Sequence, residues 1–196
     1  MIGRWFDLGF GQMFFINKDV KSHADLKGLK MRAPGGAANL ARYDGFGAKA
    51  IKIAWPDVPQ ALQRGTVDGV LTTFESVRSA KLWDSGLKHA FEDDQSFFQY
   101  VPVMSMRAWK KLSPDLQKLI VDTWESNVDS VRKLAHERQN SARKDAAKNG
   151  IHQVVATPEA RAGMRKKLLA GQAALVKKLR IDQKLVKKAE AILTTN

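Results

Sequence analysis

Hydrophobic and polar positions follow two different patterns along the chain. Residues 1–105 alternate short apolar runs with Gly- and Pro-containing turns and short helical patterns, in a repeated β-then-α order. From residue 107 onward, apolar residues recur at three- and four-residue steps, as they do along one face of a helix. The first pattern is typical of a layered α/β domain with a largely parallel sheet, and the second predicts long helices.

The first half predicts strands joined by short helices. The segment RWFDLGFGQMFFIN, near the start, predicts a pair of strands separated by a glycine break. Further strands are expected in LKMRA, KAIKIAW, VDGVLTTF and SFFQYVPVMSM, and helices in GAANLARYDGFG, PDVPQALQRG and ESVRSAKLW. The acidic run from Glu92 to Asp94 precedes the last of these strands, and we interpret it as a solvated turn.

Helix signals mark the second half. Ser113, Pro114 and Asp115 have the residue types of an N-cap, a first helical position and a first turn. The apolar spacing then continues as far as Gly150, which predicts a helix far longer than the ordinary dozen residues. We expect so long a helix to cross between two lobes. A short strand in IHQVVA and a capped helix opened by TPEARAG should follow it.

Charge is distributed unevenly over the 196 residues, whose net charge is +13. Residues 1–100 contain 13 Lys and Arg against 11 Asp and Glu, whereas residues 101–196 contain 20 against 9. A basic nucleic-acid-binding protein is therefore one alternative, and steeply salt-dependent DNA binding would support it. We favour solvated helix faces, and expect no nucleic-acid partner, because aromatic residues are not interleaved with the basic ones. The basic residues in question are Arg165, Lys166, Lys167, Lys177 and Lys178.

Catalytic and metal-binding motifs are not evident in the sequence. There is no cysteine, and the four histidines are scattered without a ligand spacing, so we expect neither a metal nor a cofactor. No nucleophile, base and orienting group can be assembled, which argues against an enzyme. An enzyme that acts on a carboxylic acid, with Arg32 as its substrate clamp, remains the other alternative. Turnover lost on Arg32→Ala would favour it.

Three segments carry a resemblance to a known family. They are DLKGLKMR before a turn of small residues, ALQRGTVDG after a Trp-containing segment, and LSPDLQK at the start of the long helix. In this order and spacing, nearly the whole chain resembles the substrate-binding proteins of TRAP transporters, the DctP-like family. The resemblance implies an α/β, periplasmic-binding-protein-like two-lobed fold that closes around a small organic acid, without enzymatic activity.

The resemblance implies ligand contacts at seven positions. In the family, the arginine of the LKGLKxR segment pairs with the carboxylate of the bound acid, and here this arginine is Arg32. Its planar guanidinium can offer a carboxylate two parallel hydrogen bonds. Without the resemblance, a surface ion pair of Arg32 with Asp44 or Asp57 is the alternative. The other implied ligand-binding residues are Gln12, Gly35, Trp55, Thr72, Thr73 and Phe74.

Several of these positions depart from the family pattern. Gly35 and Thr72 stand where members carry an amide side chain that contacts the ligand, and Gln12 lies where many carry a second arginine. Trp55 could stack over the carbon chain of a ligand or simply pack in the core. With a single cation, we expect a monocarboxylate with an apolar or aromatic body rather than a dicarboxylate.

Family members are longer at the N-terminus, so we expect this chain to be N-terminally truncated and to lack much of the first lobe. Residues 1–97 and 138–165 are expected to form the second lobe, residues 98–137 to contribute a strand and the long helix to the first, and residues 166–196 to form C-terminal helices. The resemblance also implies a periplasmic location and a TRAP permease as membrane partner, although no signal peptide is visible. An incomplete lobe should expose an apolar patch and favour self-association.

Overall fold

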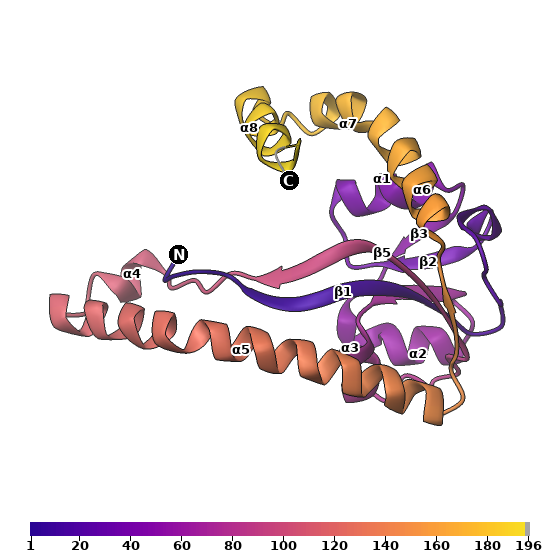
Figure 1. Ribbon diagram of the computed structural model, residues 1–196, viewed down its shortest axis with the longest axis horizontal. Helices are drawn as coiled ribbons and strands as arrows, with labels where there is room; N and C mark the ends of the chain where they lie inside the picture. Colours follow the sequence, from indigo (N-terminus) through magenta and orange to yellow (C-terminus); the bar gives the residue numbers. More distant parts are fainter. Residues whose placement is uncertain (195–196) are drawn as a thin grey trace.

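A mixed six-stranded sheet organises the computed structural model, which describes residues 1–194 (Figure 1). The strand order is β3-β2-β4-β1-β5-β6. The strands are β1 (Phe6–Phe15), β2 (Lys30–Ala33), β3 (Lys49–Lys52), β4 (Gly69–Thr72), β5 (His89–Tyr100) and β6 (His152–Val155). Each predicted strand segment contains or overlaps a strand. The strand expected in SFFQYVPVMSM begins earlier, at His89, and ends at Tyr100, before Pro102.

Helices alternate with these strands in the first half and dominate the second. The helices are η1 (His23–Leu26), α1 (Ala37–Gly45), η2 (Trp55–Asp57), α2 (Val58–Gln63), α3 (Phe74–Ser79), α4 (Met106–Trp109), α5 (Pro114–Lys148), α6 (Pro158–Ala170), α7 (Gln172–Lys178) and α8 (Gln183–Thr194). Of the segment 166–196 expected to be helical, residues 195 and 196 lie outside the described part. No helix within the described residues is long and apolar enough to cross a membrane.

The sheet is less uniform than the expected parallel one. Strand β2 runs parallel to both β3 and β4, and β5 runs parallel to β6. Between these two parallel groups lies β1, which is antiparallel to both of its neighbours, β4 and β5. Strands β4 and β5 therefore run in the same direction, and β1 is inserted between them in the opposite direction.

The predicted glycine break in the first segment is a bulge, not an interruption. Phe6–Phe15 forms one strand, and its pairing with β5 shifts register between Asp7 and Gly9 and again between Gly11 and Met13. Gly9 has φ +115, a backbone conformation that favours glycine. The prediction of two strands was therefore wrong, because the glycines bend the ladder without ending it.

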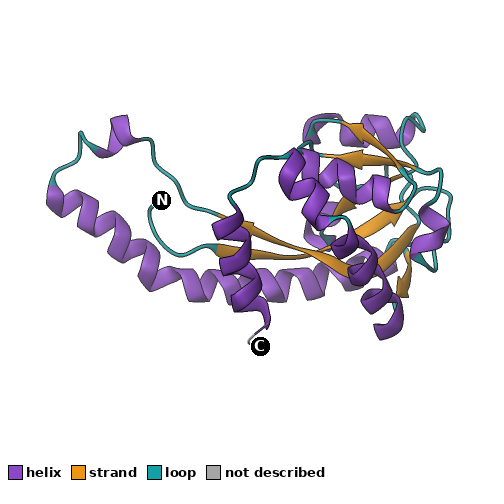
Figure 2. Ribbon diagram, turned by 90° about the horizontal axis from the view of Figure 1, so that it is seen from above, coloured by secondary structure: helices purple, strands orange, loops and turns teal. Residues whose placement is uncertain are grey.

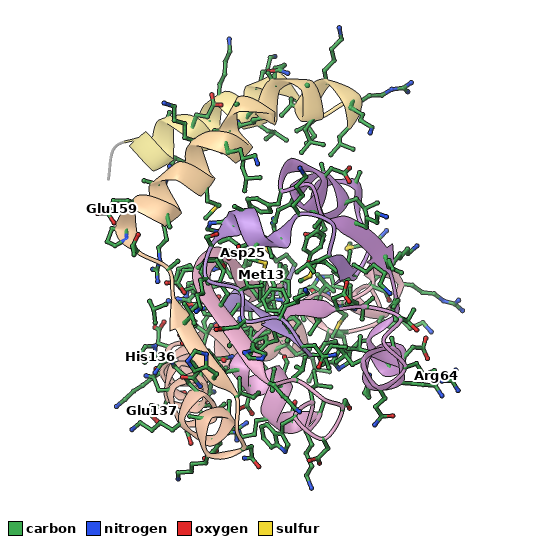
Figure 3. All side chains as sticks on the ribbon, turned by 90° about the vertical axis from the view of Figure 1, so that its right-hand side faces the viewer. Met13, Asp25, Arg64, His136, Glu137 and Glu159 are labelled. Atoms are coloured by element: carbon green, nitrogen blue, oxygen red, sulfur yellow. The ribbon has the colours of Figure 1, made fainter. Side chains whose placement is uncertain are left out.

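Helices cover both faces of the sheet. Met13 and Phe15 belong to one apolar cluster, whereas Phe14 belongs to the other, as the alternation of side chains along a strand requires. One cluster packs α2, α3 and the C-terminal part of α5 against the sheet, and the other packs η1 and α1, with α6 at its margin. Figure 3 shows Met13 deep in the interior and Arg64 at the periphery.

Glu92 and Asp93 of the acidic run are buried in β5, and Asp94 is half-buried there, which corrects the interpretation of the run as a solvated turn. Glu92 is 8% exposed and is held by the guanidinium of Arg143, whose Nε and Nη2 donate to it over 2.8–3.0 Å. Asp93 is 1% exposed, and its Oδ2 lies 2.9 Å from Nε2 of His23. Buried carboxylates are tolerated when they are paired in this way. The partners lie 51 and 70 residues away, so local sequence could not reveal them.

Helix α5 begins and ends where its sequence signals predict. The hydroxyl of Ser113 accepts a hydrogen bond from the backbone N–H of Leu116, and the helix ends at Lys148, close to Gly150. Its N-terminal part, with α4 and the outer ends of β1 and β5, forms an arm that extends beyond the rest of the sheet (Figures 1 and 2).

The arm exposes many large apolar side chains. It contains an apolar pocket of about 530 Å³, which is lined mostly by Ile2, Leu119, Ile120 and Trp124. Other exposed apolar residues of the arm are Phe97, Tyr100, Val103, Met106 and Leu116. An apolar surface of this extent is typical of a surface that contacts another part of a protein or a partner.

We expect the chain to self-associate through this arm as its concentration rises, because association would remove the apolar side chains from water. Light scattering should show a mass that increases with concentration, and Leu119→Lys should reduce the increase. The matched control is Leu185→Lys on α8, since Leu185 is exposed but lies away from the arm. A monomer at all concentrations would contradict the expectation.

Gly69 of β4 packs directly against the backbone of β1. A Cβ at this position would lie 2.4 Å from the carbonyl oxygen of Phe14 and 2.8 Å from Cδ1 of Phe15. Gly69→Ala should therefore lower the free energy of unfolding by roughly 2–3 kcal/mol, because backbone must shift to relieve the overlap. Urea unfolding measures the effect. As control, Gly163→Ala in α6 meets only open space and should raise stability by about 0.5–1 kcal/mol.

Candidate functional site

Arg32 is a buried cation at the edge of the sheet. It lies in β2, one residue before the strand ends and the Pro34-Gly35-Gly36 turn leads into α1. The residue is 6% exposed, and its Nε donates a hydrogen bond to the carbonyl oxygen of Ile53 over 3.0 Å. The short loop after β3 thus fixes one edge of the guanidinium.

The charge of Arg32 is not neutralised by a carboxylate. Burial lowers the pKa of Arg32 below its usual range, opposed only by the nearby Tyr43. Neither Asp44 nor Asp57 forms the ion pair that was the alternative interpretation, nor does another described carboxylate. Placing a cation away from water costs free energy unless a partner compensates it, so this guanidinium is suited to receive an anion.

A pocket of about 250 Å³ opens beside Arg32. It lies at the carboxyl ends of the parallel strands β2 and β4, which is where ligands bind in open α/β sheets. Arg32 is its only charged lining residue among the described ones. The pocket is lined by Leu8, Arg32, Pro34, Trp55, Leu71, Thr72, Ser76, Phe98 and Tyr100.

Three of the predicted residues thus meet in one pocket. The Trp55 ring lies against the Arg32 guanidinium, whose Cζ is 5.4 Å from the ring centroid. The arrangement holds the guanidinium plane by a cation–π contact and leaves Trp55 37% exposed. Thr72 ends β4, and its position brings a hydroxyl to the pocket wall. Arg32, Trp55 and Thr72 can therefore offer a ligand a positive charge, an apolar face and a hydroxyl group.

Tyr43 holds the backbone of Arg32 in place through a hydrogen bond. Its hydroxyl donates a hydrogen bond to the carbonyl oxygen of Arg32 over 3.1 Å, and the side chain is 1% exposed. Burial raises the pKa of Tyr43 to about 12, although the neighbouring Arg42 and Arg32 oppose the shift. Tyr43 therefore stays a neutral donor and fixes the backbone at the end of β2.

Three other predicted residues do not line this pocket. Thr73 is fully buried, and its hydroxyl caps α3 by accepting a hydrogen bond from the N–H of Ser76. The ring of Phe74 packs edge-to-face on Phe14 in the core, with centroids 5.0 Å apart. Gly35 lies in the turn after β2 with φ +113, and the Cε of Lys52 lies 3.3 Å from where its Cβ would be. These positions serve the fold around the pocket.

Gln12 faces a second cavity, of about 340 Å³, between β1, β5 and α5. Its side-chain amide donates to Asp94 over 2.6 Å and accepts from the backbone N–H of the same residue. Phe74 lines this cavity too, but Arg32 does not. The structure thus separates Gln12 from Arg32, although both were expected at one ligand.

The cations of the second cavity are already paired. Arg143 forms its hydrogen bonds with Glu92, and Arg132 donates to Asp129 and to the carbonyl oxygen of Trp5. An incoming anion would have to displace these partners. The pocket beside Arg32 requires no such displacement, and it is therefore the better candidate for an anion.

The pocket also uses residues that the sequence did not suggest. Leu8 comes from β1, Phe98 and Tyr100 come from β5, and Ser76 from α3. Phe98 and Tyr100 are the most distant from Arg32 in the sequence. The sequence shows that aromatic residues cluster in the segment SFFQYVPVMSM. It does not show the strand register that brings these residues near the end of β2.

Comparison with known proteins identifies similar sequences. The family described as bacterial extracellular solute-binding protein, family 7 (DctP), matches residues 4–178. A solute-binding protein of Verminephrobacter eiseniae is 34% identical over 118 residues, which are 60% of this chain and 35% of that protein. The C4-dicarboxylate-binding periplasmic protein DctP of Rhodobacter capsulatus is 26% identical over 159 residues, 80% of this chain and 47% of that protein. The chain spans less than half the length of either relative.

Solved structures share the fold. A TRAP periplasmic solute-binding protein from Desulfovibrio salexigens with bound orotic acid superposes with a TM-score of 0.89 at 23% identity, covering 95% of this chain and 60% of that one. A second, from a Bradyrhizobium species in complex with galacturonate, has a TM-score of 0.85 at 26% identity and covers 96% and 60%. A third, from Shewanella oneidensis, has bound succinate, a TM-score of 0.83 and 23% identity, covering 95% and 60%. The expected fold class is confirmed.

The raised pKa of Tyr43 predicts a loss of stability at alkaline pH. In the unfolded chain a tyrosine ionises near pH 10, about two units below Tyr43 in the folded chain. Between these values the folded state holds a proton that the unfolded state has lost, so stability falls as the pH rises. The loss should reach roughly 2–3 kcal/mol by about pH 12.

Urea unfolding between about pH 9 and pH 12 would measure this loss in the parent and in Tyr43→Phe. The variant should lack this part of the pH dependence. Tyr100→Phe is the matched control, because Tyr100 is 53% exposed and should behave as the parent does. Identical pH profiles for all three chains would contradict the role assigned to Tyr43.

Proposed function

We propose that this chain, which belongs to the DctP family of bacterial extracellular solute-binding proteins (family 7), binds a small organic acid through Arg32 as part of a TRAP transport system. Members of this family are binding components of transport and not enzymes. The observation that carries the proposal is the buried guanidinium of Arg32, which lines a pocket and has no described carboxylate partner.

The chemistry of the pocket suits a carboxylate. With Nε bound to Ile53, the remaining nitrogens of the guanidinium are available to donate to a carboxylate, which prefers such a forked pair of donors. Burial would strengthen the interaction, since the surroundings are poorly polarisable. Ligand binding would in turn supply the negative charge that the buried cation lacks.

The lining favours a monocarboxylate with an apolar or aromatic body. Arg32 is the single cation of the described lining, which gives a second carboxylate no partner. The rings of Trp55, Phe98 and Tyr100 offer apolar surface, while Thr72 and Ser76 bring hydroxyls. The ligands of the similar solved structures include orotic acid, galacturonate and succinate, so family members of this fold accept both mono- and dicarboxylates.

The wider arrangement agrees with a two-lobed binding protein. In this proposal residues 1–97 and 138–165 form one lobe, and residues 98–137 contribute to the other by way of the arm. The apolar surface of the arm supports this division, because a second lobe would cover it. Closure of the lobes would bury the ligand, and a membrane permease would receive it. Periplasmic relatives support a periplasmic location.

A thermal-shift panel of mono- and dicarboxylates, in the presence of a chelator, tests the proposal. A ligand at a hundredfold excess over its Kd should stabilise the parent chain by about 2.7 kcal/mol. Arg32→Lys keeps the charge but loses the fork, and Arg32→Gln loses both. Because charge-assisted hydrogen bonds contribute about 1.5–3 kcal/mol, each variant should bind the acid at least about tenfold more weakly.

Arg64→Gln is the matched control for this panel. Arg64 is exposed, lies at the periphery of the molecule (Figure 3) and does not line the pocket, so its loss should leave the shift unchanged. Trp55→Phe should weaken acids with an aromatic body more than small aliphatic ones, since the larger indole is lost. An acid that stabilises the parent and Arg32→Gln equally would refute the assignment of Arg32.

A further inference from the structure

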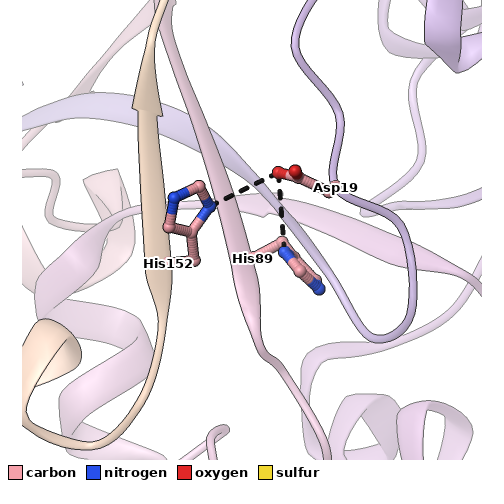
Figure 4. Close-up of side chains that lie close together, drawn as sticks. All are labelled: Asp19, His89 and His152. Atoms are coloured by element: carbon pink, nitrogen blue, oxygen red, sulfur yellow. Dashed lines mark ion pairs between the residues drawn. The ribbon is translucent and has the colours of Figure 1, made fainter.

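Two histidines and an aspartate converge at the starts of β5 and β6, whereas the other end of β5 lines the pocket beside Arg32. His89 begins β5, His152 begins β6, and Asp19 lies in the loop after β1 (Figure 4). The Oδ1 atom of Asp19 lies 3.4 Å from Nδ1 of His152 and 3.7 Å from Nδ1 of His89. All three atoms lie within 4.8 Å of one another.

The register of the sheet creates this cluster. His89 and His152 are paired directly across the parallel ladder of β5 and β6, so their side chains leave the same face of the sheet. Phe15 at the end of β1 is paired with His89, and the chain turns there and brings Asp19 over the two rings. The expectation that the histidines are unrelated rested on sequence spacing, which cannot detect such a pairing.

We propose that Asp19, His89 and His152 form a binding site for a divalent transition metal ion, with Zn²⁺ as the best-suited ion. Imidazole nitrogen and carboxylate oxygen are ligands that zinc prefers. Two ligands at about 2.0–2.1 Å from a tetrahedral zinc lie about 3.4 Å apart, close to the two distances found here. Three protein ligands leave the fourth position open to water.

A second observation supports a metal rather than an ordinary ion pair. Nδ1 of His89 is buried and has no hydrogen-bond partner among the described residues, and 3.7 Å from Asp19 is too far for a hydrogen bond. A buried polar atom without a partner is rare in a stable fold. A metal ion between the three side chains would satisfy it with a small inward shift of each.

Lys21 contacts the carboxylate of the proposed site. Its Nζ lies 3.3 Å from Oδ2 of Asp19, so one carboxylate oxygen faces the lysine while the other faces the histidines. Partial desolvation would raise the pKa of Asp19, but Lys21 and the two histidines hold it below its usual range. The ammonium group competes with a metal for the same carboxylate.

Such a site would link three segments that are distant in the sequence. It joins the loop after β1 to the starts of β5 and β6, and the opposite ends of β1 and β5 contribute Leu8, Phe98 and Tyr100 to the pocket. Binding of a metal would therefore stabilise the sheet without contacting the acid. This inference is independent of the proposed function, since neither site contains a residue of the other.

Calorimetric titration of the untagged full chain with Zn²⁺, together with thermal melts, tests the site. The parent should bind one Zn²⁺ and melt at a higher temperature when it is bound. His152→Ala should bind at least about tenfold more weakly, yet melt like the parent in a chelator, because the His152 side chain is 61% exposed. Asp19→Asn, which keeps the shape and removes the charge, should behave in the same way.

Two further variants separate a metal site from an ion-pair cluster. Lys21→Ala should raise the affinity for Zn²⁺, because it removes the competing cation. His136→Ala is the matched control: His136 lies on α5, away from the cluster, and its loss should leave zinc binding unchanged. If Zn²⁺ does not raise the melting temperature of the parent, or raises that of His152→Ala equally, the proposal is overturned.

Discussion

The pairing of β1 with β4 on one side and β5 on the other locates every site in the molecule. Gln12 lies opposite Thr72 in this ladder, and Phe15 lies opposite both Gly69 and His89. The same strand therefore fixes the wall of the anion pocket at one end and the histidine cluster at the other. Only a residue without a side chain fits at Gly69, so the closeness of β1 and β4 depends on that glycine. A slip by one residue would turn every side chain of β1 to the opposite face.

The sheet held together by β1 tolerates a buried cation, Arg32, without a carboxylate partner among the described residues. A cation removed from water is costly, and here only one carbonyl group, one aromatic ring and the backbone support from Tyr43 compensate it. An ion pair with a neighbouring aspartate would have been the easier solution for stability alone. Its absence among the described residues leaves the guanidinium available for a ligand, at a cost that the two apolar clusters of the sheet must offset.

Local signals in the sequence predicted the elements well and their pairing poorly. The caps at Ser113 and Thr157 open α5 and α6 as expected, because a cap is a contact between residues three apart. The antiparallel placement of β1, the burial of Glu92 and the meeting of His89 with His152 all depend on contacts between distant segments. The hydrophobic pattern within one segment does not indicate which strand will pair with it.

The residues of the candidate site show the same difference between local signals and contacts of distant segments. Arg32 and Trp55 were expected at the ligand because of the family resemblance, which rests on local segments at a strand end and before a helix, and both line the pocket. Phe98 and Tyr100 were missed as pocket residues because they approach Arg32 only through the register of β5. Tyr100 is paired with Phe6, beyond both register shifts of β1, and Phe98 is paired with Gly9, between the two shifts. Arg32, in contrast, lies on β2 within the covered part of the sheet. The same irregularities that the sequence analysis interpreted as a break between two strands therefore determine where these rings lie relative to the guanidinium, because each shift in register changes which residues of β5 face β1.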